Sequence, residues 1–119
     1  MKLHPPLQSA KNVFARRMKQ KRVERGLSQK QLGIAAGLDV GVASARINRY
    51  ETGVHAPDYL TALRIAEALG TALPSLYTDD DRLLQVIDGY TMADAQTQKM
   101  VESLLQPFAP PKLQAAGKV

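Results

Sequence analysis

Residues 27–53 read LSQKQLGIAAGLDVGVASARINRYETG and decide the fold of this chain. Ser28 comes just before an apolar-periodic segment, and Gln31 follows three residues later, as in a capping box at the start of a helix. Gly37 interrupts the pattern, and a second segment with two arginines follows. The stretch therefore predicts two short helices joined by a tight turn, a layout typical of proteins that read DNA.

The second segment is expected to form a helix that Asp39 caps and that runs to about Thr52. Spacings of three and four residues place one apolar stripe along it, made of Val40, Ala43, Ile47 and Tyr50. Its other face carries arginine, asparagine and small side chains, which can bond or touch base edges in the major groove. We expect base contacts from Arg49, Asn48, Arg46, Ala45, Val42 and Ser44.

Helical patterns continue on both sides of this pair, and no strand pattern is found. A first helix ends at Gly26, a fourth begins at Asp58 and ends at Gly70, and a short fifth begins near Pro74. A sixth is expected at about residues 81–89, and a seventh, capped by Thr91, at about 92–106. The chain is therefore predicted to be all-α.

Positive charge is concentrated in the first part of the chain. Residues 11–64 contain eleven Lys and Arg against four acidic residues, a net charge of +7, within a chain whose formal net charge is +5. Residues 65–119 contain four basic residues against seven acidic ones. The first part is expected to bind a polyanion, and the second to have another role.

Composition excludes several classes of protein. The 119 residues contain no cysteine, so disulfides and thiolate metal sites are absent. No apolar run approaches 18 residues and the N-terminus lacks a signal-peptide pattern, so we expect a cytoplasmic protein without a membrane span. No acidic or histidine cluster has metal-ligand spacing, and no glycine-rich phosphate loop occurs. We therefore expect no enzyme, no metal and no cofactor.

The segment LSQKQLGIAAGL followed by INRYETG resembles the Cro and phage-repressor family of helix-turn-helix regulators, also called XRE-type. The resemblance covers about residues 11–78 and includes APDYLTALRIAEALG, which is similar to the fourth helix of that family. It implies a five-helix, lambda-repressor-like DNA-binding bundle. It also implies double-stranded DNA as a partner and binding as a homodimer.

The resemblance also implies roles for individual residues. Gln29 matches the polar residue that binds phosphate at the start of the second helix, and Thr52 matches a phosphate-binding position after the recognition helix. Arg22 and Glu51 match a family pair that forms an ion pair between the first and third helices. Together with nearby basic side chains, the expected phosphate-binding residues are Gln29, Lys30, Thr52, Arg22, Arg17 and Lys19.

The chain departs from the common family pattern by four extra residues between Leu38 and Ile47. Four residues make about 1.1 helical turns, so they could lengthen the recognition helix without rotating its face. We expect this longer helix, from about Asp39 to Thr52. The alternative is a longer turn with Ser44 capping a shorter helix, which Gly41 would favour.

Four parts are expected along the chain: a flexible arm at 1–10, the DNA-binding domain at 11–78, a helical hairpin at 79–106 and a disordered tail at 107–119. The acidic run at 79–81 either caps the sixth helix or forms a hinge. The hairpin is expected to pack or to dimerise, burying Leu83, Leu84, Ile87, Met100, Val101, Leu104 and Leu105.

These patterns favour a sequence-specific transcriptional regulator, and more specifically a repressor, that places its recognition helix in the major groove of operator DNA. The alternative is an antitoxin-like or adaptor module that binds a protein partner through its C-terminal helices. The acidic second part of the chain and its proline-rich tail motivate this alternative.

Overall fold

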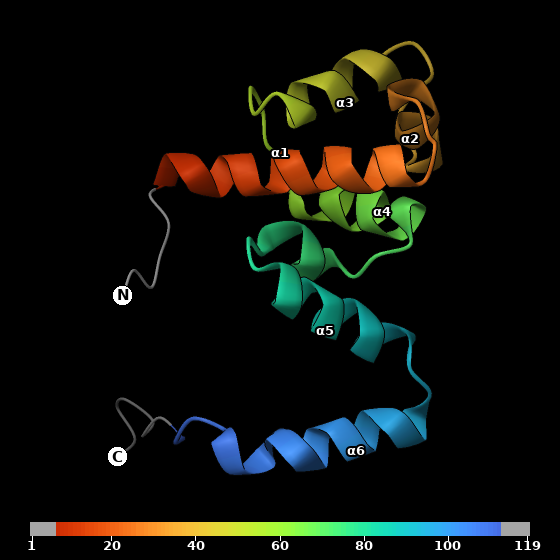
Figure 1. Cartoon of the computed structure of the whole chain (residues 1–119). Coiled ribbons are helices and arrows are strands. Elements are labelled where there is room, and N and C mark those ends of the chain that lie inside the picture. The colour runs from red at the N-terminus through yellow and green to blue at the C-terminus, as the bar shows by residue number, and fades with distance from the viewer. Residues whose placement is uncertain (1–6, 113–119) are drawn as a thin grey trace, which may run out of the picture. The chain divides into compact units, whose positions relative to one another are not determined.

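The computed structural model describes residues 7–112, and all regular structure in that range is helical (Figure 1). This confirms the predicted all-α class. In chain order the elements are α1 (Leu7–Glu24), α2 (Gln29–Ala35), α3 (Ala43–Glu51), α4 (Tyr59–Leu69), the 3-10 helix η1 (Leu73–Tyr77), α5 (Asp81–Met92), α6 (Ala95–Leu105) and the 3-10 turn η2 (Gln106–Phe108). The chain divides into two compact units between Asp88 and Gly89.

The first unit is built around α1, which contacts α3, α4 and η1. In Figure 1, α3 lies above α1, and η1 and the start of α5 lie below it. Met18, Leu32, Ile47 and Leu76 come from four different elements and are fully buried. Burying a side chain of this size contributes about 1.5–3 kcal/mol relative to leaving it exposed. This shared core fixes α3 with one face inward and the other in solvent.

Local sequence signals set most helix ends in this unit. Ser28 and Gln31 form the predicted capping box, in which each side chain accepts from the other residue's backbone N–H. Asp58 caps α4 by accepting from the Thr61 backbone N–H at 2.8 Å. Gly70 ends α4 at φ +67°, in the left-handed region that favours glycine. The predicted fifth helix is present as η1.

The recognition helix is shorter than predicted, and the expectation of a helix from Asp39 to Thr52 is wrong. Helix α3 begins at Ala43, with Val42 as its N-cap residue and Thr52 as its C-cap residue. The extra residues form an exposed turn, closed by the Val42 N–H donating to the Asp39 carbonyl oxygen at 3.0 Å. The insertion therefore lengthens the turn, although Ser44 lies inside the helix instead of capping it.

A close approach between α2 and α3 explains why the helix begins at Ala43. Ala43 is fully buried, and a Cβ atom built on Gly33 would lie 2.7 Å from the Ala43 Cβ and 2.9 Å from its carbonyl oxygen. Only glycine at position 33 lets the two backbones approach this closely. Ala43 must therefore face α2, and the four preceding residues have to turn the chain.

We expect Gly33→Ala to destabilise the protein. Overpacking of a tight contact costs about 1–3 kcal/mol, which exceeds the roughly 0.5–1 kcal/mol that alanine gains over glycine inside a helix. Thermal unfolding followed by circular dichroism measures the change. Gly41→Ala is the matched control, because no atom lies within 4 Å of its added Cβ. Equal melting temperatures for the two variants would contradict the close approach.

The first part of α5 is held to α1 by ion pairs. Asp79 pairs with Arg16, and the Arg17 Nη2 lies 2.8 Å from the Asp81 Oδ1. Asp80 caps α5 by accepting from the backbone N–H groups of residues 82 and 83. Of the two alternatives predicted for the acidic run at 79–81, a helix cap or a hinge, the structure shows the helix cap. Residues 79–88 belong to the first compact unit, whereas the sequence grouped them with the hairpin.

Asp88 joins three elements of the first unit. Its carboxylate accepts hydrogen bonds from the Ser75 hydroxyl at 2.6 Å, the Thr71 hydroxyl at 2.8 Å and the Ala72 N–H at 3.2 Å. The Lys21 ammonium lies 3.0 Å away on its other oxygen. Burial raises the pKa of Asp88, but these hydrogen bonds outweigh burial and hold the pKa below its ordinary value.

We expect Asp88→Asn to cost about 1–3 kcal/mol at neutral pH, because it weakens hydrogen bonds to a charged group. A lowered native pKa means that the unfolded chain binds the proton more readily. The stabilisation is therefore complete above about pH 5 and is lost as the pH falls through the ordinary value near 3.9 and then the native one. Urea unfolding of both proteins between pH 7 and pH 3 should show the difference shrinking. A constant difference would contradict the role of the ionised carboxylate.

The second unit contains the end of α5 together with α6. Helix α5 continues through Thr91 to Met92, so the prediction that Thr91 caps the last helix is wrong. Asp94 is the cap instead, accepting from the Thr97 N–H at 2.7 Å. The Gln98 side chain donates to the Tyr90 carbonyl oxygen at 2.8 Å, which ties α6 to the last part of α5.

Both predicted tails overlap helical residues. Helix α1 begins at Leu7, so the last four residues of the expected arm are helical, and residues 1–6 lie outside the described range. Pro107 and Phe108 belong to η2, residues 109–112 have no regular structure, and residues 113–119 also lie outside the described range.

Candidate nucleic-acid interface

The outer face of α3 presents polar and small side chains to solvent. Every residue predicted to read bases is exposed, and all but one lie on α3; Val42, at the N-cap, is 43% exposed. The opposite face is anchored by the buried side chains of Ala43, Ile47 and Tyr50. The exposed residues on α3 are Ser44, Ala45, Arg46, Asn48 and Arg49.

An ion pair between α1 and the end of α3 holds this helix in place. The Arg22 guanidinium bonds the Glu51 carboxylate through two nitrogens, one of them at 3.2 Å, and also donates to the Leu27 carbonyl oxygen at 2.8 Å. The side chains are only 14% and 4% exposed. Arg22 is thus directed inward, and its expected second role in phosphate binding is not supported.

The Gln29 side chain also forms hydrogen bonds with this ion pair and with α3. Its amide nitrogen donates to the Asn48 Oδ1 and to the Glu51 Oε1, each at 3.1 Å. Both hydrogens of the amide group are therefore used inside the protein. Without DNA this side chain therefore has no unused donor, and its contact with DNA phosphate stays a prediction.

Arg17, which we expected to bind phosphate, is instead buried and bonded inside the protein. Its side chain is 4% exposed, and its Nε donates to the Thr78 carbonyl oxygen at 2.8 Å. Its Nη2 faces Asp81 in a geometry that makes an ion pair but no hydrogen bond. The sequence did not predict this role, because Thr78 and Asp81 lie more than sixty residues further along the chain.

The remaining phosphate candidates are exposed. Lys19 lies on α1 and Lys30 on α2, and both side chains reach solvent. Thr52 follows α3, and its hydroxyl donates back to the Asn48 carbonyl oxygen at 3.0 Å. Lys30 therefore lies on the helix before α3, and Thr52 lies at the C-terminal end of α3. Lys19 lies on α1, apart from both.

A hollow beside α3 includes residues that the sequence did not single out. It has a volume of about 440 Å³ and is lined by Arg46, Arg49, Tyr50, His55, Ala56 and Asp58. Hydrogen bonds from the Thr61 backbone and hydroxyl, together with the charge of Arg46, hold the pKa of Asp58 below its ordinary value. His55 lies in a loop without periodicity, so no sequence signal connected it with the two arginines.

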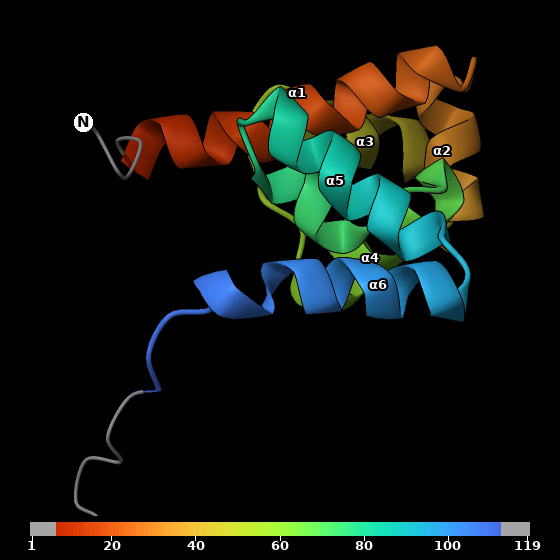
Figure 2. The same ribbon diagram turned by 60° about the horizontal axis from the view of Figure 1, so that its bottom comes forward.

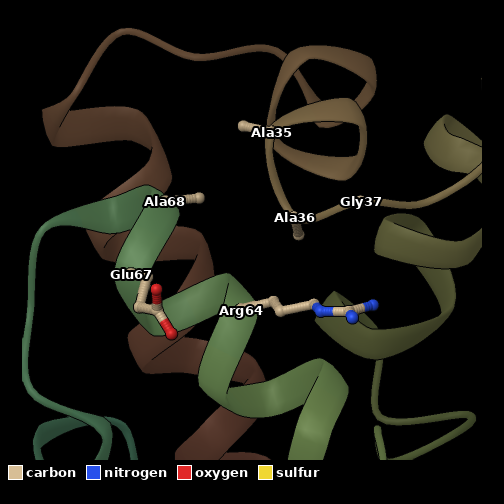
Figure 3. Close-up of a pocket in the computed structure, with 6 residues that line it drawn as sticks. All are labelled: Ala35, Ala36, Gly37, Arg64, Glu67 and Ala68. Atoms are coloured by element: carbon tan, nitrogen blue, oxygen red, sulfur yellow. The ribbon is translucent and has the colours of Figure 1, made fainter.

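Another hollow, of about 360 Å³, lies between α2 and α4 and contains none of the predicted site residues (Figure 3). Three of its six lining residues are alanines, and Arg64 extends from α4 toward the turn at Gly37. In the part of the chain that the structure describes, no group of three acidic or histidine side chains could hold a metal ion. None of the described helices is long and apolar enough to cross a membrane.

Comparisons with known proteins agree with this geometry. The family described as helix-turn-helix matches residues 18–76. A solved structure, the crystal structure of transcriptional regulator BswR, is 32% identical in sequence with a TM-score of 0.68. The match covers 78% of this chain and 92% of that chain. No curated protein sequence matches the chain.

The order of the helices, the exposed polar face of α3 and the two matches agree with one another. They confirm the predicted lambda-repressor-like bundle and a role in DNA binding and transcription regulation. The chain belongs to the XRE-type family of helix-turn-helix transcriptional regulators.

Proposed function

We propose that the protein is a sequence-specific repressor that binds operator DNA as a homodimer, with α3 of each copy in the major groove. The observation that carries the proposal is the exposed polar face of α3, held by the buried ion pair of Arg22 and Glu51. A major groove about 12 Å wide admits one helix. Repression is the simplest outcome, because an occupied operator blocks other proteins. DNA binding places this role in the cytoplasm, and we propose no catalytic activity.

Within this proposal Arg49 is the principal base reader. It is exposed and lies in the last turn of α3, whereas the charge of Arg46 is balanced in part by the carboxylate of Asp58. An arginine can bond the O6 and N7 atoms of guanine together. Ala45 and Val42 supply apolar contact to thymine methyl groups. Lys30 and Thr52 hold the phosphate backbone on either side.

The test is selection of bound duplexes from a random pool, followed by titration of the best duplex at several salt concentrations. We expect a palindrome whose half-sites are about one helical turn, 34–36 Å, apart. We also expect affinity to fall steeply with salt and to exceed nonspecific affinity by at least about 10³-fold. Weak, salt-sensitive binding without an enriched sequence would contradict operator recognition.

Exposed apolar residues support association through the C-terminal helices. Leu83, Met100, Leu104 and Leu105 are between 47% and 72% exposed, although the sequence predicted them to be buried. Leu84, Ile87 and Val101 are half-buried. We propose that a second copy covers these side chains. The same exposed side chains favour the alternative function, an adaptor or antitoxin-like module, if a different protein covers them.

We expect Leu104→Glu to shift the dimer toward monomer and to weaken operator binding, because a charge would enter an apolar interface. Sedimentation equilibrium at several concentrations measures the shift. Gln96→Glu, an exposed substitution on the same helix that adds the same charge, should leave the dimer intact. A monomeric wild type that copurifies with one stoichiometric protein would favour the adaptor function instead.

A further inference from the structure

Helix α5 is attached to the first unit without a buried side chain of its own. None of its residues is buried, and Leu83 and Val86 are 47% and 54% exposed. By contrast, α1, α3 and α4 each bury at least one side chain completely. Because the hydrophobic contribution grows with the apolar surface removed from water, packing holds α5 less firmly than it holds those helices. The polar contacts of α5 therefore decide how well it is fixed.

These polar contacts lie at both ends of the part of α5 that belongs to the first unit. At its start, Asp79 pairs with Arg16. Asp81 pairs with Arg17. At its end lies Asp88, the last residue of the unit, which bonds to α1, to η1 and to the segment before η1. The two attachments are about 10 Å apart, at a rise of 1.5 Å per residue. Two separate attachments fix the direction of a helix, whereas a single one would let it pivot.

The two attachments differ in their exposure to solvent. The side chains of Asp79 and Asp81 are 64% and 83% exposed, so water and salt weaken their ion pairs. The side chains of Asp88 and Lys21 are only 24% and 17% exposed. Asp88 also accepts from the hydroxyl of Ser75, a fully buried residue, at 2.6 Å. Asp88 is therefore the attachment that persists at physiological salt.

Helix α5 is also the segment through which the proposed dimer would set its geometry. It carries Leu83, and it continues into the second unit, whose α6 carries Met100, Leu104 and Leu105. Two recognition helices that read one operator must lie about one helical turn of DNA apart, 34–36 Å. If α5 pivoted, the dimer would sample many spacings, and binding of the second half-site would gain less from binding of the first.

We propose that Asp88 is a positioning residue that fixes α5 on the DNA-binding bundle, so that the dimer presents its two recognition helices at one spacing. The inference rests on the proposed function for the dimer and for the operator. It gives Asp88 a role beyond stability, because the distance between half-sites becomes part of what the protein recognises. Asp88 does this without contacting DNA.

The test uses operators whose half-sites are moved apart one base pair at a time. The wild type should bind one spacing best. Asp88→Ala, which removes all four contacts, should bind that operator at least about tenfold more weakly, a small part of the roughly 10²–10⁴-fold that linked binding adds. Its affinity should also depend less on spacing. Glu67→Ala, which removes an exposed acidic side chain from α4, is the matched control and should behave like the wild type.

Two further readouts separate positioning from a general loss of structure. Asp88→Ala should keep the affinity of the wild type for a duplex with a single half-site, and sedimentation equilibrium should show the same dimerisation. Partial unfolding would lower both. Thr71→Val keeps the shape of its side chain but removes one donor to Asp88, and it should broaden the spacing preference to a smaller extent. It provides the test if Asp88→Ala does not fold.

The attachment itself can be measured in the wild type by NMR. Residual dipolar couplings of residues 81–88 should fit the same alignment tensor as those of α1 and α4. A separate tensor for residues 81–88 would overturn the proposal whatever the protein binds. Because this measurement needs no variant, misfolding cannot obscure it.

Failure of this inference and failure of the proposed function are distinguishable. If the wild type is monomeric or selects no operator, both are refuted. If it binds an operator as a dimer and Asp88→Ala keeps the spacing preference of the wild type, only the positioning role of Asp88 is refuted.

Discussion

Arg22→Met should destabilise the protein by about 3–5 kcal/mol, which is the usual cost of removing one partner of a buried ion pair. Glu51 would remain 4% exposed without a cation, and the Leu27 carbonyl oxygen would lose its donor. Since domains are typically stable by only about 5–15 kcal/mol, this is a large share of the total. Urea unfolding followed by circular dichroism provides the measurement.

A second substitution separates the buried charge from the loss of packing. The double variant Arg22→Met with Glu51→Leu replaces the pair by apolar side chains and should recover much of the lost stability. Lys19→Met is the matched control, because it removes one exposed positive charge from the same helix. If Arg22→Met costs no more than Lys19→Met, the ion pair does not hold α3 in the way that we describe.

Arg49→Ala should lower affinity for the selected operator by about 5- to 150-fold, which corresponds to about 1–3 kcal/mol, and should relax preference at one base pair. The cause is loss of a contact to a base edge, so nonspecific binding should change much less. Titration against the selected operator and against an unrelated duplex measures both effects.

Two control variants distinguish base reading from general attraction to DNA. Lys30→Ala should weaken binding to all sequences alike and reduce the salt slope by about one. Arg82→Ala removes an exposed charge from the start of α5, on the opposite side of α1 from α3 (Figures 1 and 2), and should have little effect. Equal, sequence-independent losses for Arg49→Ala and Lys30→Ala would make Arg49 a phosphate contact.

Local signals in the sequence predicted the helices well. The capping box at Ser28, the cap at Asp58 and the stop at Gly70 each act within one helical turn, so neighbouring residues are sufficient to identify them. The family resemblance then supplied the order of the helices and the outer face of the third.

Features that depend on distant residues could not be predicted in this way. The start of α3 is set by contact of Ala43 with Gly33, and the four-residue insertion fitted a longer helix equally well. Arg17 has the same local sequence character as an exposed basic residue, yet it is buried, pairs with Asp81 and donates to the Thr78 carbonyl oxygen. The directional hydrogen bonds of Gln29 likewise require a structure, because three separate segments meet there.

The ion pairs along α1 have a consequence for how the protein finds DNA. Arg16, Arg17 and Lys21 are matched by Asp79, Asp81 and Asp88, so much of the positive charge of this helix is cancelled on the side that meets α5. Near α3, Lys30 and Arg49 have no acidic partner among the described residues. We therefore expect an asymmetric electrostatic field around the first unit. Steering by such a field raises association rates, and we expect it to favour encounters in which the recognition helix faces the duplex.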